Sequence, residues 1–365
     1  GRDHVTVAEA AFDADHRLMA LRIDCVCNLG AYNSPEGQLM ASDLVLKVLP
    51  GVYDVQKAFY TVKGIFSNTT PTDAYRGAGR PEAIYVIERL MDWSARQLGV
   101  DGFELRRKNF SPRDKFPYVS VSGETYDVGD FHRVLDRAMD VADVNGFAAR
   151  KQDSIRSGKL RGLGLSYYIE SILGSQHETT TIDFAEDGMV DLRVGTQSNG
   201  QGHETVFAQF LHERAGIPFD RIRLIQGDSD LIERGGGTGG SRSVTMQGNS
   251  IRKTADEVIE LFRPIAEEEL EVAGADLLFE DGVFRIAGTD REIGLLELSG
   301  VARHKGRTDL LSTTRSFKVP GRSYPNGAHL AEVAIDPDTG VTRVVKYTVV
   351  DDFGYLVNPM LAEGQ

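Results

Sequence analysis

A glycine-rich turn set directly before a helix is the feature that most constrains this chain. It first occurs at residues 74–80, Ala-Tyr-Arg-Gly-Ala-Gly-Arg. Glycines let a backbone approach a ligand closely, and a helix N-terminus offers unpaired N–H groups to an anion. Pro81 and Glu82 suit a first helical turn, and apolar residues then recur at helical spacing to about Leu98. The pattern predicts either a ligand-binding loop that carries Arg76 or a loop that this arginine ties down.

Strand, acidic turn and strand recur along the chain. One such pattern spans residues 8–32, a matching one spans residues 331–355, and a weaker copy spans residues 181–195. Asp338-Thr339-Gly340 is typical of a hairpin turn. The recurrence predicts either unrelated hairpins with aspartate-rich turns or two related lobes.

Apolar residues at helical spacing predict further helices between these hairpins. The expected helices cover residues 81–98, 129–153, a segment starting at His203, and 243–273. Residues 108–127, with two prolines, are expected to connect two lobes. The mixture indicates an α+β fold of two related elongated lobes, each made of hairpins with packed helices. We expect the C-terminal part of a first lobe over residues 1–127 and an incomplete second lobe over residues 128–365.

A second glycine-rich turn joins an expected strand at residues 189–194 to the helix that begins at His203. Its Gly200-Gln201-Gly202 suits a dinucleotide phosphate. A complete Rossmann fingerprint needs a third glycine where Thr205 stands, and the Gly-Lys-Ser/Thr of a P-loop does not occur. The segment therefore predicts either a phosphate contact or a tight turn.

Residues 235–243, Gly-Gly-Gly-Thr-Gly-Gly-Ser-Arg-Ser, form the strongest candidate anion site. Core packing does not explain five glycines, because glycine loses the most conformational freedom on folding. Their exposed N–H groups, with hydroxyls and the Arg242 guanidinium beside them, suit phosphate oxygens. The alternative is a flexible surface loop, although such linkers rarely end in Ser-Arg-Ser before a long helix.

Composition disfavours several classes of partner. A net charge of −13 argues against nucleic acid or an anionic membrane surface. No apolar run approaches the roughly 20 residues of a membrane span, and the eight histidines show no zinc-ligand pair. The only cysteines are Cys25 and Cys27, which we expect on opposite faces of a strand, and this disfavours a disulfide or an iron–sulfur site. A reducing, cytoplasmic setting is the simplest interpretation.

Residues 68–83, Asn-Thr-Thr-Pro-Thr-Asp-Ala-Tyr-Arg-Gly-Ala-Gly-Arg-Pro-Glu-Ala, resemble the active-site loop of the large subunit of molybdenum hydroxylases. This is the xanthine dehydrogenase and aldehyde oxidase family, and the form here is most similar to its aerobic carbon-monoxide-dehydrogenase type. Residues 195–205, 227–243 and 324–365 are similar to the same family in the expected order. The resemblance therefore covers essentially the whole chain.

The resemblance implies a molybdopterin cofactor with molybdenum, in the cytosine dinucleotide form. The pterin's own sulfurs hold the metal in this family, so no protein ligand to the metal is expected. The residues that it assigns to the cofactor are Gly77, Ala78, Gly200, Gln201, Gly202, His203, Thr238, Gly239, Gly240, Ser241, Arg242, Ser243 and Gln365. It also implies FAD and [2Fe–2S] centres on partner subunits, in a dimer of heterotrimers.

The reaction that the resemblance implies is oxidative hydroxylation of an aldehyde or N-heteroaromatic C–H, with water as the oxygen donor. Arg76 would orient this small-molecule substrate, whereas the general-base glutamate of the family is expected outside this chain. Members that oxidise carbon monoxide carry a copper-binding cysteine where Gly77 stands, so that substrate is a disfavoured alternative. The other alternative is a cofactor-free lobe or assembly module. The ends read as cut, so we expect a fragment of a larger subunit that is inactive in isolation.

Overall fold

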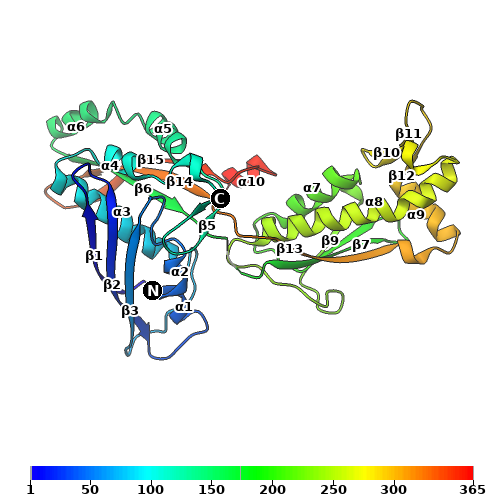
Figure 1. The fold of residues 1–365 in the computed structure, drawn as a ribbon, viewed down its shortest axis with the longest axis horizontal. Helices are drawn as coiled ribbons and strands as arrows, with labels where there is room; N and C mark the ends of the chain where they lie inside the picture. The colour runs from blue at the N-terminus through cyan, green and yellow to red at the C-terminus, as the bar shows by residue number, and fades with distance from the viewer. Residues whose placement is uncertain (1, 173, 365) are drawn as a thin grey trace. The chain divides into compact units, whose positions relative to one another are not determined.

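The chain forms two compact units in the computed structural model, which describes residues 2–172 and 174–364. Unit 1 comprises residues 1–171 and 322–354, and unit 2 comprises residues 172–321 and 355–365. Each unit has its own hydrophobic core, and both combine antiparallel hairpins with packed helices (Figure 1). The α+β prediction is therefore confirmed. The expected division at residue 127 concerns lobes of a larger subunit and stays a prediction.

Unit 1 contains two three-stranded sheets. In the first, β2 pairs antiparallel with β1 and parallel with β3, and in the second, β14 lies between β15 and β6 with both pairings antiparallel. Buried and more exposed residues alternate along β1 and β2, as expected for strands with one face on a core. The strands are β1 (His4–Phe12), β2 (Leu18–Gly30), β3 (Lys57–Phe66), β4 (Tyr118–Val119), β5 (Thr125–Tyr126), β6 (Leu160–Ile169), β14 (Asn326–Ile335) and β15 (Thr342–Asp352).

Helix α3 (Arg80–Leu98) is the long helix of unit 1, and its predicted position is confirmed. Proline stands in its first turn, and Gly99, in the left-handed region at φ 69°, ends it. Its buried stripe joins the core, and within it Glu88 forms a buried ion pair of 2.9 Å with Arg106 of the next helix. The other helices are α1 (Gly37–Ala41), α2 (Asp43–Leu46), α4 (Gly102–Asn109), η1 (Arg113–Lys115), α5 (Phe131–Ala142) and α6 (Phe147–Arg156).

Unit 2 is built on a four-stranded sheet of order β13-β7-β8-β9, in which only the β8–β9 pairing is parallel. Helices α7 and α8 contact each other and the sheet, and their apolar faces form the core. The strands are β7 (His177–Phe184), β8 (Val190–Val194), β9 (Ile222–Ile225), β10 (Leu277–Glu280), β11 (Val283–Ile286), β12 (Glu292–Gly294) and β13 (Ser312–Lys318). The helices are α7 (His203–Ala215), η2 (Phe219–Arg221), the π-helical η3 (Ser243–Gln247), α8 (Gly248–Leu270), η4 (Gly274–Asp276), α9 (Leu295–His304), η5 (Thr308–Leu310) and α10 (Pro359–Glu363).

The same chain path occurs in both units. A hairpin (β1–β2 or β7–β8) is followed by helix, a strand parallel to its second arm (β3 or β9), a glycine-rich turn and a long helix (α3 or α8). All three predicted hairpins form, and Gly340 ends the β14–β15 turn. The two best-matched sequence copies, however, both lie in unit 1, and the relation between the units is one of topology.

Two local expectations, on residues 129–153 and on the two cysteines, were wrong. The helix expected over residues 129–153 is two helices, because Asp143 adopts a left-handed φ of 51° and Gly146 follows. Residues 108–127 lie within unit 1, and their expected role as a connection between lobes of a larger subunit stays a prediction. Cys25 and Cys27 both face the interior, because residues two apart in a strand share a face.

Two searches of the described residues bear on function. No helix within them has the length and apolar character that a membrane crossing requires. No group of three or more histidine, cysteine or acidic side chains in the same residues is arranged to hold a metal ion.

Candidate functional site

The two glycine-rich turns of unit 2, at residues 195–203 and 235–243, lie side by side. The Gly237 N–H donates to the Gly195 carbonyl at 3.2 Å. Thr238 Oγ1 accepts from the Gln197 N–H at 3.1 Å and donates to the carbonyl of the same residue at 2.6 Å. Residues separated by some 40 positions in the chain thereby form one backbone surface, which the sequence alone had treated as two sites.

Close backbone approach explains two of the glycines. A Cβ added at Gly235 would lie 2.6 Å from the Gly195 Cα, and one added at Gly195 would lie 2.5 Å from the Gly235 Cα. Real Cβ atoms do not approach backbone so closely, so neither position accepts a side chain without movement. These glycines set the spacing between the turns.

Other glycines of the same turns face open space. Nothing lies within 4 Å of a Cβ added at Gly200, Gly237 or Gly239. Among the described residues, the backbone N–H groups of residues 238–241 have no hydrogen-bond acceptor. Gly240 and Ser241 adopt left-handed φ values of 62° and 59°, which is costly for a serine and gives a turn that gathers N–H groups. The arrangement is suited to bind an anion.

His203 stands at the start of α7 and is almost fully buried. Its Nε2 lies 3.0 Å from Gln201 Nε2, and its Nδ1 lies 3.3 Å from Gln226 Oε1. Burial lowers the pKa of His203, and the Gln226 hydrogen bond and the Glu204 charge oppose that shift. A neutral ring that donates from Nδ1 and accepts at Nε2 fits both neighbours. The histidine therefore orders the turn at residues 195–203 through its contacts with Gln201 and Gln226.

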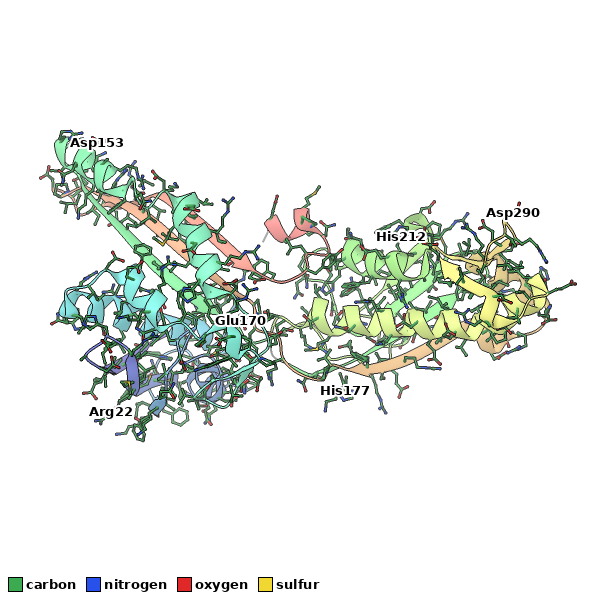
Figure 2. The ribbon with its side chains drawn as sticks, turned by 45° about the horizontal axis from the view of Figure 1, so that its top comes forward. Arg22, Asp153, Glu170, His177, His212 and Asp290 are labelled. Atoms are coloured by element: carbon green, nitrogen blue, oxygen red, sulfur yellow. The ribbon has the colours of Figure 1, made fainter. Side chains whose placement is uncertain are left out.

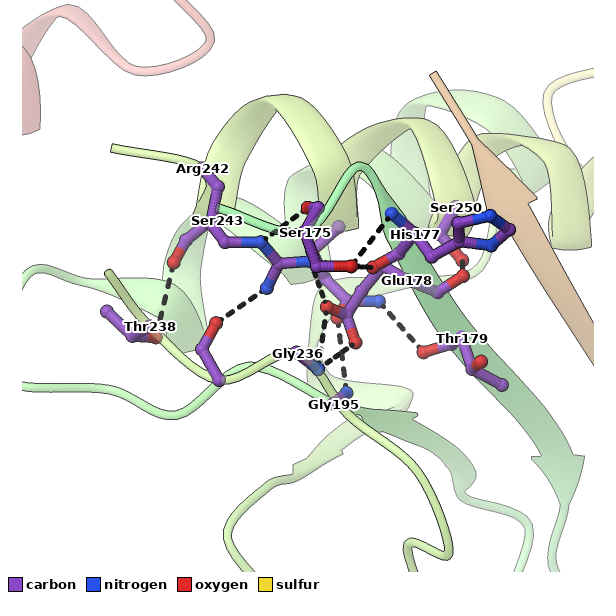
Figure 3. Close-up of polar contacts among 12 residues, drawn as sticks. Ser175, His177, Glu178, Thr179, Gly195, Gly236, Thr238, Arg242, Ser243 and Ser250 are labelled. Carbon is purple, nitrogen blue, oxygen red and sulfur yellow. Dashed lines mark hydrogen bonds and ion pairs between the residues drawn. The ribbon is translucent and has the colours of Figure 1, made fainter. Parts of the chain in front are cut away.

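The sequence suggested that Arg242 extends its guanidinium toward an anion at the surface. In the structure the guanidinium points into the protein. The side chain is 1% exposed and pairs with the fully buried Glu178 at 2.5 Å (Figure 3). It also donates to the carbonyls of Ser175, Gly237 and His177 at 2.6 to 2.9 Å. Only the backbone of Arg242, together with its neighbours, is therefore placed to face a ligand.

Arg76, Gly77 and Ala78 belong to unit 1, where they form the turn before α3. Gly77 and Ala78 have positive φ values of 90° and 29°. The Arg76 carbonyl accepts from Arg2 Nη2 at 2.7 Å, whereas its exposed guanidinium has no hydrogen bond or ion pair with any described residue. The side chain is free to contact a small molecule.

Within unit 2, the C-terminal segment at residues 357–361 lies close to the turn at residues 195–203. A Cβ at Gly202 would lie 2.8 Å from Leu361 Cδ1, and Gln209 Nε2 of α7 donates to the Val357 carbonyl at 3.2 Å. Asn358 caps α10 by accepting from the Leu361 N–H at 3.0 Å. Gln365, assigned to the cofactor by resemblance, lies outside the described residues.

Sequence reasoning missed the polar side chains that organise these turns. Glu178 accepts from the Gly236 N–H at 3.2 Å, and Gln247 Oε1 accepts from the Gly195 N–H at 3.1 Å. Gln226 Oε1 accepts from the Ser198 N–H at 3.0 Å. Glu178 carried one available signal, because an acid on the inward face of a strand requires a buried partner.

Two sequence profiles, each described as a molybdopterin cofactor-binding domain, match residues 1–110 and 137–365. The chain belongs to the molybdopterin cofactor-binding domain family. It is homologous to large subunits of molybdenum hydroxylases, which confirms the resemblance drawn from the glycine-rich motifs.

The carbon monoxide dehydrogenase large chain of Hydrogenophaga pseudoflava is 33% identical over 100% of this chain and 48% of its own length. The 6-hydroxypseudooxynicotine dehydrogenase complex subunit gamma of Paenarthrobacter nicotinovorans is 30% identical over 100% of this chain and 47% of its own. The solved structure of quinoline 2-oxidoreductase from Pseudomonas putida 86 superposes with a TM-score of 0.92 at 30% identity, covering 100% of this chain and 49% of that one. The chain spans about half the length of these relatives.

The paired glycine turns fit a molybdopterin cofactor that carries phosphate. They supply backbone N–H groups without acceptors, beside glycines with open space, as described above. In addition, the buried Thr196 hydroxyl has no partner in the described part of the chain. These turns thus hold a donor set suited to phosphate oxygens.

Proposed function

We propose that this chain is the cofactor-binding portion of a molybdenum hydroxylase that oxidises an aldehyde or N-heteroaromatic C–H. The overall reaction converts R–H and water to R–OH, two protons and two electrons. The observation that carries the proposal is the single backbone surface formed by residues 195–203 and 235–243. Its shape and free N–H groups suit a phosphate of the family's cofactor.

The chain's own residues would act mainly by binding and orienting. When bound, the cofactor supplies the two-electron oxidation and the activation of water. The cofactor would contact the backbone of Gly200, Gln201 and Gly202, whose conformation His203 fixes. Its phosphates would accept hydrogen bonds from N–H and hydroxyl groups of residues 238–243. Gly77, Ala78 and Gln365 are proposed as further cofactor contacts because the family resemblance assigns them.

Arg76 would orient the substrate. A free guanidinium offers paired donors to a carbonyl or a ring nitrogen, and its charge favours electron-rich groups. Nothing in the described part of the chain competes for these donors. The general base is proposed to come from a residue outside this chain.

Gly77 supports an organic substrate over carbon monoxide. A solved relative of the chain is described as a Cu,Mo-CO dehydrogenase, and copper requires a soft ligand such as a thiolate. The two cysteines of this chain are buried on β2. A Cβ at Gly77 would lie 2.7 Å from Pro81 Cγ, at a φ of 90° that side chains rarely adopt.

The remaining features of the proposal follow from the family. We propose the cytosine dinucleotide form of the cofactor, and partner subunits that carry FAD and [2Fe–2S] centres. Two cysteines are too few for such a cluster, so a [2Fe–2S] centre would lie outside these 365 residues. A dimer of heterotrimers in the cytoplasm completes the proposal.

The proposal is tested on the complete subunit purified with its natural partner chains. Elemental analysis should give molybdenum and pterin in equal amounts with the subunit, and nucleotide release should yield a cytidine nucleotide. Aldehydes, quinoline-type heterocycles and carbon monoxide are then compared with an artificial electron acceptor in ¹⁸O-labelled water. We expect turnover of one organic class with ¹⁸O in the product. Absence of molybdenum and pterin, or oxygen derived from O₂, would contradict the proposal.

A further inference from the structure

Two buried arginines occupy the same place in the two units. Arg80 is the first residue of α3, immediately after the glycine turn of unit 1, and Arg242 ends the glycine turn of unit 2 directly before η3 and α8. Both follow a strand that runs parallel to the second arm of a hairpin. The side chains are 5% and 1% exposed, respectively.

Arg242 is surrounded by backbone carbonyls. Its Nη1 donates to the carbonyl of Gly237, within the glycine turn, at 2.6 Å. Its Nε and Nη2 donate to the carbonyls of Ser175 and His177 at 2.9 and 2.7 Å, and Glu178 balances the charge (Figure 3). The same carboxylate accepts from the Gly236 N–H at 3.2 Å, so the ion pair binds both sides of one turn.

Arg80 repeats the arrangement in unit 1. Its Nη1 donates to the carbonyls of Gly77 and Ala78 at 3.2 and 2.9 Å, and its Nη2 donates to the Ser171 carbonyl at 2.7 Å. Its Nε lies 2.9 Å from Glu170 Oε1, at the end of β6, where Figure 2 labels Glu170. Burial raises the pKa of Glu170, and the Arg80 charge opposes that rise.

A turn that offers its N–H groups to an anion faces a difficulty with its carbonyls. Carbonyl oxygens that pointed at the same anion would repel it, so they must point into the protein, where each needs a donor. A guanidinium has five N–H groups in a rigid plane and can satisfy several inward carbonyls at once. A single ammonium group cannot reproduce that fork.

We propose that Arg242, held by Glu178, is a positioning residue that fixes the glycine turn of unit 2 with its carbonyls inward and its N–H groups outward. Arg80, held by Glu170, does the same for the turn that carries Arg76. Neither guanidinium contacts the ligand. The nature of that ligand rests on the proposed function, whereas the conformational role of the two arginines does not.

A third buried pair provides a matched control. Arg106 and Glu88 are 1% and 4% exposed and lie 2.9 Å apart, so the loss of their pairing costs a comparable amount of stability. Arg106 donates to carbonyls of Gly102, Glu88 and Leu165, none of which belongs to a glycine-rich turn. It tests what a buried arginine does when it only supports the fold.

The experiment compares Arg242→Lys with Arg106→Lys in the complete subunit with its partner chains. Hydrogen exchange of peptides covering residues 235–241 is measured in cofactor-free protein, and the rate of pterin loss is measured in cofactor-loaded protein by fluorescence. We expect Arg242→Lys to accelerate exchange of the Gly236 and Gly237 N–H groups, which are bonded to Glu178 and to the Gly195 carbonyl, by at least about tenfold and to speed pterin loss by a similar factor. Arg106→Lys should lower the unfolding midpoint while both local rates stay at the wild-type value. If Arg242→Lys does not fold, Glu178→Gln takes its place with the same readouts.

Two results would overturn the proposal. One is wild-type exchange at residues 235–241 in the folded Arg242 or Glu178 variant. The other is equal acceleration in the Arg106 variant, which would make the effect one of general stability. If the wild-type subunit holds no pterin, the proposed function fails, but the exchange comparison still decides the role of Arg242.

Discussion

Substituting Gly239 by alanine should separate ligand binding from folding. A Cβ there meets nothing within 4 Å, and the φ of Gly239 lies outside the left-handed region. Folding should therefore tolerate the methyl group, and the reduced freedom of the unfolded chain should add about 0.4–1 kcal/mol of stability. The proposed cofactor needs the same space, so the methyl group should interfere with its approach to the N–H groups of residues 238–241.

Gly235→Ala is the control in which an added methyl group should reduce stability. Its Cβ would lie 2.6 Å from the Gly195 Cα, against an ordinary contact of 3.4–4 Å, so the two turns must separate by about 1 Å. Overpacking of this kind costs about 1–3 kcal/mol. This variant should lose stability even without cofactor.

The assay is thermal unfolding of cofactor-free protein by circular dichroism, combined with pterin retention after gel filtration of loaded protein. Gly239→Ala should retain pterin at least about tenfold less well, a loss of roughly 1.4 kcal/mol, with an unfolding midpoint at or above the wild-type value. Wild-type pterin retention in Gly239→Ala would show that the cofactor does not bind this backbone.

Three further predictions concern single side chains. Arg76→Gln should change the free energy of unfolding, measured with urea, by less than about 0.5 kcal/mol. The same variant should lower kcat/KM by about tenfold or more in steady-state kinetics. An unchanged kcat/KM would show that Arg76 does not orient the substrate. Glu88→Ala should cost about 3–5 kcal/mol in urea unfolding, because it leaves Arg106 with only Asp92 as an acidic partner and removes the acceptor of the Tyr53 hydroxyl and the Tyr167 N–H. A loss below about 1 kcal/mol, the size seen for surface pairs, would contradict this. Burial lowers the pKa of His203 below 6.5, so the stability that its neutral ring contributes is complete above pH 6.5 and is lost as the pH falls below that value. His203→Gln should therefore flatten the fall in stability below pH 6.5, measured by urea unfolding, and an unchanged slope would exclude His203 as its source.

Much of the local structure was predictable from sequence because short-range signals and burial agreed. Pro81 and Gly99 bracket α3, Gly202 precedes α7, and aspartate-rich turns mark the hairpins. The break between α5 and α6 also had a local signal, in the Asn145-Gly146 pair, that apolar periodicity outweighed.

The arrangement of the site was less predictable, because it depends on contacts between distant segments. The glycine-rich runs at residues 195–203 and 235–243 predicted exposed backbone, but no local sequence pattern predicted that the two turns contact each other. Arg242 illustrates the limit: a basic residue in a glycine-rich turn reads as an anion ligand, and only the buried Glu178 on β7 turns it inward. The role of Arg242 thus depends on which segments the fold brings next to it and not on its local sequence.

The family assignment came from motifs whose spacing is unusual enough to be specific. Profile matches over residues 1–110 and 137–365 confirm it. The individual cofactor contacts stay proposals, since they depend on a bound ligand.

The central claim is that one backbone surface, made from two glycine-rich turns of unit 2, binds the cofactor's phosphates. Hydrogen exchange of the complete subunit with and without cofactor tests it most directly. We expect exchange in peptides covering residues 195–203 and 235–243 to slow together when the cofactor is bound, while α9 exchanges equally in both states. Protection of only one turn, or of neither in pterin-loaded protein, would contradict it.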